Sequence, residues 1–282
     1  MEIHSFIYWN ADPDLVRFGP ITIRWYGLFF ATAFFSGFYM VQRMFKSENK
    51  EDKDLDTLLF YIMSGTIIGA RLGHTLFYDP IYYLGHPLEI LSVWKGGLAS
   101  HGGAAGIIIS LYLFSRRRNE YPFIFLLDRI AIPSLFGGAL VRIGNFFNSE
   151  IIGMPSKVPW AIVFERIDTM PRHPAQLYEA AAYLLLFSTA IYLYRSGSVK
   201  RMPGLMTGFY FASVFSARFF IEFVKTRQAA YGIDLPLSVG QMLSIPFIAA
   251  GITLLVVSLK RGYREGGKPA LCDNPSLMNE KA

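Results

Sequence analysis

The sequence lacks several features that equip other enzymes and secreted domains. Its 282 residues include one cysteine, Cys272, which excludes an internal disulfide and a cysteine-based metal site within one chain. It contains no Walker loop, no paired Asp/Glu set and no His/Cys spacing typical of a metal site. We therefore expect no cofactor and no metal. The N-terminal segment MEIHSFIYWN lacks a basic region followed by an apolar core, so we also expect no cleavable signal peptide.

Charged residues are scarce as well. They make up 17% of the chain, whereas a typical soluble domain has about 25%. Hydrophobic residues make up 52%, and apolar runs of roughly 20 residues recur, which is the length needed to cross a bilayer. The composition predicts an all-α polytopic membrane protein. The net charge of +6 lies mainly between the apolar runs, which favours a membrane surface over nucleic acid as the partner.

Seven apolar segments are predicted to span the membrane. The connection at 148–173 is too polar to span and contains several prolines, so we expect it to form a small folded cap. We expect one transmembrane domain at 1–262 and a mobile tail at 263–282. The predicted spans are roughly 21–43, 56–78, 97–115, 123–147, 174–195, 204–224 and 237–260.

Lysine and arginine are distributed unequally between the two sets of loops. The loops at 43–53, 116–118 and 195–201, together with the chain from residue 260 onward, contain 15 of them, and the opposite loops contain 7. Because cytoplasmic loops carry an excess of Lys and Arg, we expect the N-terminus outside and the C-terminus in the cytoplasm. The 148–173 cap then lies on the outer side.

The sequence VRIGNFFNSEIIG at 141–153 places polar residues where the fourth predicted span reaches its outer end. Arg142 and Asn145 are three residues apart and therefore share one helical face. Ionisable residues inside membrane segments are costly and usually functional. Glycines such as Gly153 allow close approach of a neighbour or a ligand. The alternative interpretation is packing glycines with one arginine that extends to the interface.

Four more predicted spans bring polar side chains to the same outer boundary. Several arginines at one depth would repel one another unless they shared an anion, and arginine pairs bidentately with phosphate. The pattern therefore predicts a site for an anionic lipid head group. Asp128 and Arg129, near the inner end of the fourth span, are the exception to this trend. The outer side chains on those four spans are Arg24; Arg71, His74 and Tyr78; His101; and Arg218 and Glu222.

The segment KGGLASHGG at 95–103 has four glycines around His101. Histidine is the natural general base near neutral pH, and small neighbours would let a substrate approach it. A histidine hydrogen-bonded between helices is an equally good interpretation, and the sequence does not decide between them. The glycines at 65, 69 and 73 are spaced for helix packing. We expect the polar residues at 173–179, Glu179 among them, to cap and brace the fifth span.

At these residues the chain resembles the prolipoprotein diacylglyceryl transferase family of bacterial membrane enzymes. The resemblance extends over the chain up to about residue 265. Its elements occur in order and together are specific: IRWYG at 23–27, GARLGH at 69–74, GGLASHGG at 96–103, the stretch at 142–153, HPAQLYE at 173–179 and RFFIEF at 218–223.

The resemblance implies a reaction. A diacylglyceryl group would move from phosphatidylglycerol to the lipobox cysteine of a signal-peptide-bearing preprolipoprotein, forming a thioether and releasing glycerol-1-phosphate. The enzyme would lie in the bacterial cytoplasmic (inner) membrane among membrane lipids, with its active site in the outer leaflet and its cap in the periplasm. His101 would accept the thiol proton, and Arg142 and Arg218 would hold the phosphate. The other expected substrate-binding residues are Tyr26, Arg71, Asn145, Glu150, Gly153 and Glu222.

Two other functions are compatible with parts of the pattern. A lipid transporter or flippase could use the same basic outer-leaflet pocket, but it should continue the polar residues to the inner leaflet or show paired broken helices. An intramembrane serine protease could use Ser100 or Ser149 with a histidine. Replacing both serines would distinguish these cases, because a transferase that uses the sulfur of its substrate needs neither.

Overall fold

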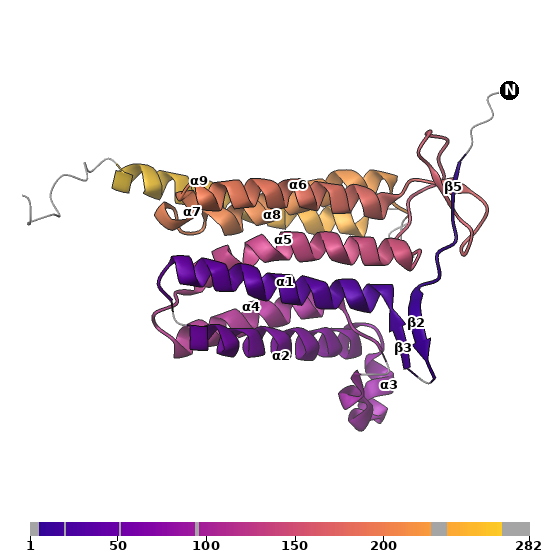
Figure 1. The fold of residues 1–282 in the computed structure, drawn as a ribbon, viewed down its shortest axis with the longest axis horizontal. Coiled ribbons are helices and arrows are strands. Elements are labelled where there is room, and N and C mark those ends of the chain that lie inside the picture. The colour runs from indigo at the N-terminus through magenta and orange to yellow at the C-terminus, as the bar shows by residue number, and fades with distance from the viewer. Residues whose placement is uncertain (1–5, 20, 51, 94–95, 227–235, 267–282) are drawn as a thin grey trace, which may run out of the picture.

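Seven long helices dominate the part of the chain that the structure describes. The computed structural model describes residues 6–19, 21–50, 52–93, 96–226 and 236–266. The long helices coincide with the seven predicted segments (Figure 1). They are α1 (Trp25–Ser47), α2 (Asp52–Phe77), α4 (Ser100–Arg117), α5 (Phe123–Phe147), α6 (Ala175–Arg195), α8 (Leu205–Ile221) and α9 (Val239–Gly266).

Within the described residues, four of these helices are long and apolar enough to cross a membrane. They are Lys53–Phe77, Phe123–Phe147, Ala175–Arg195 and Val239–Gly262. The mainly helical membrane architecture is therefore confirmed, whereas the number of seven crossings stays a prediction. Helix α9 continues to Gly266, past the expected end of the last span. Residues 267–282 of the predicted tail, Cys272 among them, lie outside the described residues.

The strands lie at one end of the helix bundle, which we call the sheet end (Figure 1). A three-stranded sheet has the order β1-β4-β5, with β1 parallel to β4 and β4 antiparallel to β5. A two-stranded sheet pairs β2 with β3. The strands are β1 (Ile7–Trp9), β2 (Asp14–Phe18), β3 (Ile21–Arg24), β4 (Ile162–Phe164) and β5 (Pro171–Arg172). The 148–173 connection thus forms a small folded cap, as predicted, and β1 completes it.

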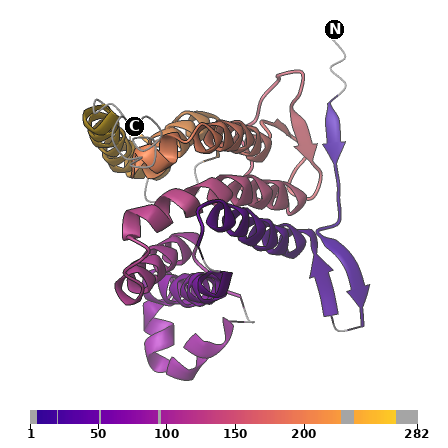
Figure 2. The ribbon, with the colours of Figure 1, turned by 60° about the vertical axis from the view of Figure 1, so that its left-hand side comes forward.

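The remaining short helices connect the long ones. Helix α3 (Pro80–Gly85) and the 3-10 helix η1 (Pro87–Leu91) follow α2, α7 (Ser198–Arg201) precedes α8, and the 3-10 helix η3 (Glu222–Val224) follows α8. Helix α5 is central, because it packs against α1, α6 and α8, while α9 packs against α8 and α2 pairs with α4 (Figure 2). The main apolar core includes the buried side chains of Phe45, Phe114, Leu126 and Ile132.

Glycines make the contact between α2 and α4. A Cβ atom added to Gly69 would lie 2.4 Å from the carbonyl oxygen of Gly102, and one added to Gly65 would lie 2.6 Å from that of Gly106. Real side chains do not approach backbone this closely, so the two helices touch through their backbones. The predicted packing role of the α2 glycines is confirmed, and the series at Gly65, Gly69 and Gly73 meets its counterpart on α4.

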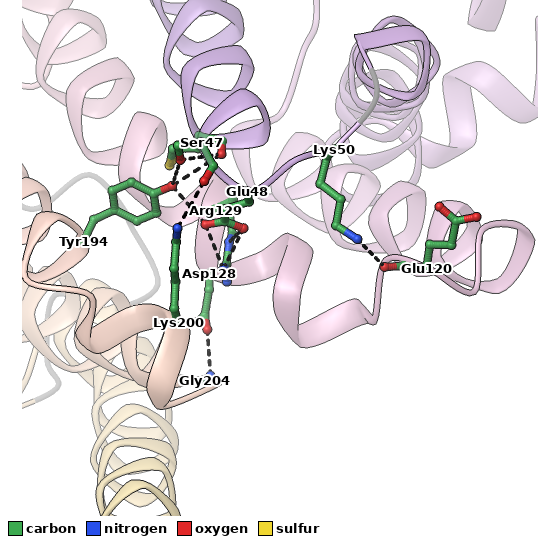
Figure 3. A network of polar contacts seen from close by, with 10 residues as sticks. Ser47, Glu48, Lys50, Glu120, Asp128, Arg129, Tyr194, Lys200 and Gly204 are labelled. Carbon is green, nitrogen blue, oxygen red and sulfur yellow. Dashed lines mark hydrogen bonds and ion pairs between the residues drawn. The ribbon is translucent and has the colours of Figure 1, made fainter. Parts of the chain in front are cut away.

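Asp128 and Arg129, at the opposite end of the bundle, form hydrogen bonds and an ion pair with other parts of the chain (Figure 3). Asp128 is fully buried and accepts hydrogen bonds from the backbone N–H groups of Gly204 (2.7 Å) and Thr207 (2.8 Å), which caps α8. Arg129 pairs with Glu48 at 3.0 Å, and both side chains are under one-tenth exposed. These charges are saturated by protein groups, so they do not extend a polar path from the sheet end.

Candidate active site

The polar residues at the end of α5 form a chain of hydrogen bonds. The Nη1 group of Arg142 donates to Oδ1 of Asn145 at 3.2 Å, and Nδ2 of Asn145 donates to Oε2 of Glu150 at 3.1 Å. Asn148 donates to the other carboxylate oxygen of Glu150 at 3.2 Å. The three-residue spacing therefore places Arg142 and Asn145 together, as predicted. Asn145 is 5% exposed, so it serves first to connect the arginine with the carboxylate.

Glu150 sits in a strained turn. Ser149 and Ile151, its two neighbours, both have φ near 56°. This left-handed conformation is uncommon for residues other than glycine, and for a β-branched side chain it is an outlier that costs about 1–3 kcal/mol. The turn is held by a hydrogen bond from Nε2 of Gln176 on α6 to the carbonyl oxygen of Glu150, at 2.6 Å. In this turn the Glu150 carboxylate lies back against the end of α5, where it accepts hydrogen bonds from Asn145 and Asn148.

Glu179 on α6 is the closest carboxylate to Arg142. Its Oε2 atom lies 2.8 Å from Nε of Arg142, and its Oε1 atom lies 3.6 Å from Nζ of Lys225. The side chain is 1% exposed, yet neither carboxylate oxygen has a hydrogen bond of good geometry within the described part of the chain. The contact with Arg142 is therefore an ion pair by distance without hydrogen-bond alignment, and Glu179 depends on the charges around it.

Arg142 and Arg218 line the same cavity. It has a volume of about 210 Å³ and lies between α5, α6 and α8. Its walls are mainly apolar, but Ser134, Tyr183 and Tyr210 carry hydroxyl groups. Arg218 comes from the last turn of α8 and has Tyr183, Glu179 and Glu222 as its electrostatic neighbours. The full lining is Ser134, Leu135, Gly138, Val141, Arg142, Tyr183, Tyr210, Val214, Phe215 and Arg218.

Two further predicted residues lie close to this group. The ring of Tyr26 packs on α5, where a Cβ atom at Gly144 would lie 2.9 Å from its Cδ2 atom. Glu222 accepts a hydrogen bond from Oγ of Ser238 at 3.1 Å, and its other oxygen lies 3.2 Å from Nζ of Lys225. Glu222 is therefore held at the end of α8 by its own partners.

Gly153 is enclosed by backbone. A Cβ atom there would lie 2.4 Å from the carbonyl oxygen of His173 and 2.8 Å from that of Val224. The N–H group of Gly153 donates to the same His173 oxygen at 3.0 Å, and Thr226 donates from Oγ1 to the Gly153 carbonyl at 3.0 Å. The glycine thus joins the cap to the segment after α8, and no side chain fits at this position.

The cap is braced by an ion pair outside the helices. Arg172 donates from Nε to Asp168 at 3.0 Å, and its Nη1 group donates to the carbonyl oxygen of Gly153 at 3.3 Å. The hydrogen bonds from Arg172 lower the pKa of the Asp168 carboxyl group, so the pair remains charged at neutral pH. Sequence reasoning did not identify this brace.

We call the cavity that Arg142 and Arg218 share the arginine cavity. His101 does not line it. It is the second residue of α4, its side chain is exposed, and its ring lies 5.7 Å from that of Phe77 and 5.9 Å from that of Tyr78. The histidine therefore belongs to the α2–α4 pair.

Arg71 is also away from the cavity, and its donors are taken up by backbone. The guanidinium group donates to the carbonyl oxygens of Glu89 (2.5 Å), Ile90 (2.8 Å) and Gly96 (2.7 Å). The residue is 4% exposed, and its guanidinium carbon lies 5.0 Å above the ring of Tyr83. Arg71 thus holds the segment around η1 against α2, and direct contact with lipid stays a prediction.

A larger open hollow lies beside the two-stranded sheet. It has a volume of about 540 Å³ and is lined by Asn10, Asp12, Pro13, Asp14, Arg17, Arg24 and Arg166. Its charges largely pair with one another, because Asp14 lies 2.7 Å from Arg17 and 3.3 Å from Arg24. The smaller cavity is the candidate site, because Arg142 and Arg218 are half-buried there and the buried Glu179 beside Arg142 lacks aligned hydrogen bonds in the described structure. Within the described ranges, no three His, Cys, Asp or Glu side chains are placed to hold a metal ion.

The fold and the cavity define a helical membrane protein whose polar site lies at one end of an apolar bundle. Comparison with known proteins identifies its family. A family model described as prolipoprotein diacylglyceryl transferase matches residues 13–257. The chain belongs to this family, and it is therefore a transferase and a bacterial membrane enzyme.

Relatives from three bacteria, which share one name, match nearly the whole chain. Phosphatidylglycerol–prolipoprotein diacylglyceryl transferase from Chloroherpeton thalassium is 51% identical over 94% of this chain and 99% of the relative. The enzyme from Tolumonas auensis is 50% identical over 92% of this chain and 100% of the relative. That from Porphyromonas gingivalis is 41% identical over 92% and 97%, respectively.

Proposed function

We propose that this transferase moves the diacylglyceryl group of phosphatidylglycerol to the thiol of a lipobox cysteine in a preprolipoprotein. The names of the relatives support the two substrates. The observation that carries the proposal is that Arg142 and Arg218 face one cavity whose remaining walls are mainly apolar. Such a cavity suits a lipid whose charged phosphate meets the arginines while its acyl chains continue along the helices.

In the proposed reaction, the sulfur of the substrate cysteine attacks the glyceryl carbon that carries the phosphate oxygen. A carbon–sulfur bond forms, the carbon–oxygen bond breaks, and glycerol-1-phosphate leaves with the bonding electrons. Negative charge grows on the departing phosphate ester, so fixed cations beside it stabilise the transition state more than the bound substrate. Arg142 and Arg218 are placed to supply that charge.

The neighbours of the arginines prepare them for this task. Asn145 and Glu179 hold Arg142 from two sides, and Glu150 and Glu222 in turn are held by hydrogen bonds to their own neighbours. Groups that are already oriented need no reorganisation during the reaction. We propose that Tyr26 and Asn145 position the head group, and that Gly153 preserves the backbone packing that this arrangement requires.

The proposed location is the bacterial inner membrane, with the sheet end of the bundle in the outer leaflet and the cap in the periplasm. The excess of Lys and Arg in the loops at the opposite end supports this orientation. Phosphatidylglycerol would enter from the surrounding lipid, and the preprolipoprotein would present its cysteine from its membrane-embedded signal peptide.

For the thiol proton we propose His101 as the acceptor. Its side chain is exposed, so a peptide can reach it. Because His101 does not line the arginine cavity, the peptide must place its cysteine between His101 and the lipid bound in that cavity. His101→Gln should lower transfer by about 10²-fold near neutral pH, and the loss should shrink as pH rises past about 8.5, where a free thiol ionises unaided.

The test is the pH profile of transfer for His101→Gln beside that of His86→Gln, an exposed histidine between α3 and η1. The control should follow the unmodified enzyme throughout. A loss of constant size at every pH would show that His101 binds substrate and does not remove its proton.

A transfer assay tests the proposed function as a whole. The purified protein should move label from the acyl chains of phosphatidylglycerol to a lipobox peptide through a thioether, and a peptide with serine in place of the cysteine should receive none. The combined Ser100→Ala and Ser149→Gly variant should retain transfer, because the nucleophile is the sulfur of the peptide; glycine suits the left-handed backbone at 149. Cleavage of the peptide would identify a protease, and movement of lipid between leaflets without a thioether would identify a flippase; either result would contradict the proposal.

A further inference from the structure

Lys225 is a buried cation that neither the sequence motifs nor the family resemblance singled out. It follows η3 directly and is 6% exposed. Its backbone is fixed on both sides, since the Val224 carbonyl accepts a hydrogen bond from Met154 at 2.8 Å and the Thr226 N–H donates to Ile152 at 3.2 Å. The Lys225 side chain is therefore anchored where the cap meets the end of α8.

The ammonium group of Lys225 lies between two carboxylates. Its Nζ atom is 3.2 Å from Oε2 of Glu222 and 3.6 Å from Oε1 of Glu179. Arg142 contacts the other oxygen of Glu179, so this buried carboxylate lies between two cations from different parts of the chain. Glu179 has no aligned hydrogen bond in the described structure, so these two cations, together with Arg218 nearby, supply the opposite charge around it.

The charges of the residues that form the site balance only when Lys225 is included. Among the residues that form the site, the cations are Arg142, Arg218 and Lys225, and the carboxylates are Glu150, Glu179 and Glu222. Without the lysine, three carboxylates would face two arginines. A phosphate group would then approach a site with net negative charge, and like charges in a poorly solvated place repel strongly.

We propose that Lys225 is a positioning residue that neutralises Glu179 and Glu222 so that Arg142 and Arg218 keep their charge available for an anionic lipid phosphate. Lys225 acts through the two carboxylates and does not touch the substrate. The inference rests on the proposed function, because the balance of charges matters only if the site binds the phosphate of phosphatidylglycerol.

Lys225→Met, Lys225→Arg and the double variant Lys225→Met/Glu179→Gln test this role in the full chain, with Lys157→Met, an exposed lysine of the cap, as the control for total charge. In Lys225→Met, KM for phosphatidylglycerol should rise by roughly tenfold, which corresponds to about 1.4 kcal/mol. Lys225→Arg and the control should stay close to the unmodified enzyme. The double variant, which restores the balance of charges, should recover most of the rise in KM, while its kcat should fall because Glu179 also holds Arg142.

Competitive inhibition separates a charge effect from a general loss of structure. In Lys225→Met, the inhibition constant of inorganic phosphate should rise with KM, while that of uncharged diacylglycerol should stay the same. Equal weakening of both inhibitors, or an unchanged KM, would overturn the inference. Should Lys225→Met not fold, Lys225→Gln takes its place in the same comparison. Absence of transfer by the unmodified enzyme would instead contradict the proposed function itself.

Discussion

Arg142→Gln is expected to lower kcat/KM for diacylglyceryl transfer by about 10²–10³-fold, the size of effect seen when one preorganised donor to a developing negative charge is lost. Arg142 contacts Glu179 at 2.8 Å, is linked to Asn145, and faces the cavity that it shares with Arg218. Glutamine keeps hydrogen-bonding groups but removes the charge. Transfer of labelled lipid to a lipobox peptide measures the effect, and the thermal unfolding temperature shows whether the protein remains folded.

Two variants make this result specific. Arg166→Gln removes an exposed arginine from the open hollow beside the two-stranded sheet and should leave transfer almost unchanged. Arg142→Lys keeps the charge but loses the two-pronged geometry, so it should fall between the glutamine variant and the unmodified enzyme. Near-normal transfer in Arg142→Gln, or a large loss in Arg166→Gln, would move the phosphate site away from the arginine cavity.

Gly153→Ala should reduce transfer by about a hundredfold, because small displacements of catalytic groups have effects of this size. The new methyl group would overlap the carbonyl oxygens of His173 and Val224, which are backbone atoms that cannot rotate away. The segments that carry Glu150 and Lys225 would have to separate. Such overpacking usually costs about 1–3 kcal/mol, so the free energy of unfolding should fall as well.

Gly27→Ala is the matched control, because a Cβ atom at Gly27 would meet no other atom within 4 Å although the residue adjoins Tyr26. It should keep both transfer and stability. If Gly153→Ala were as active as Gly27→Ala, the backbone packing around Gly153 would not be needed for the site.

The long helices were predictable because their signal is local. Each is a run of apolar residues about long enough to cross a bilayer. The glycine series at 65, 69 and 73 predicted a helix contact, which the structure confirms. The strands were not predicted. Strand β1 is three residues long and pairs with β4 across more than 150 residues of sequence, so no local periodicity marks it.

The candidate site was predictable where position along a span indicates depth in the membrane. This rule brought together Arg142, Asn145 and Arg218. It did not identify Glu179, which was interpreted as a helix brace, although an acidic residue in an apolar helix is itself a functional signal. Lys225 was counted only as a loop charge, because its burial results from contacts between the cap and the end of α8.

Arg71 and His101 show the limit of the same rule. Both were expected at the same depth as Arg142, but depth does not say which neighbour a side chain faces. Arg71 is turned to the backbone around η1, and His101 stacks beside Tyr78 on the α2–α4 pair. The direction in which a side chain points depends on how the helices pack. The spacing of polar residues along the sequence does not predict that packing.

The most direct test of the account is an experimental structure of the enzyme with phosphatidylglycerol bound. We predict that the lipid phosphate lies between Arg142 and Arg218, with oxygen atoms about 2.7–2.9 Å from guanidinium nitrogens of both residues. A phosphate bound instead in the hollow lined by Arg17, Arg24 and Arg166, with the arginine cavity filled only by acyl chain, would contradict it.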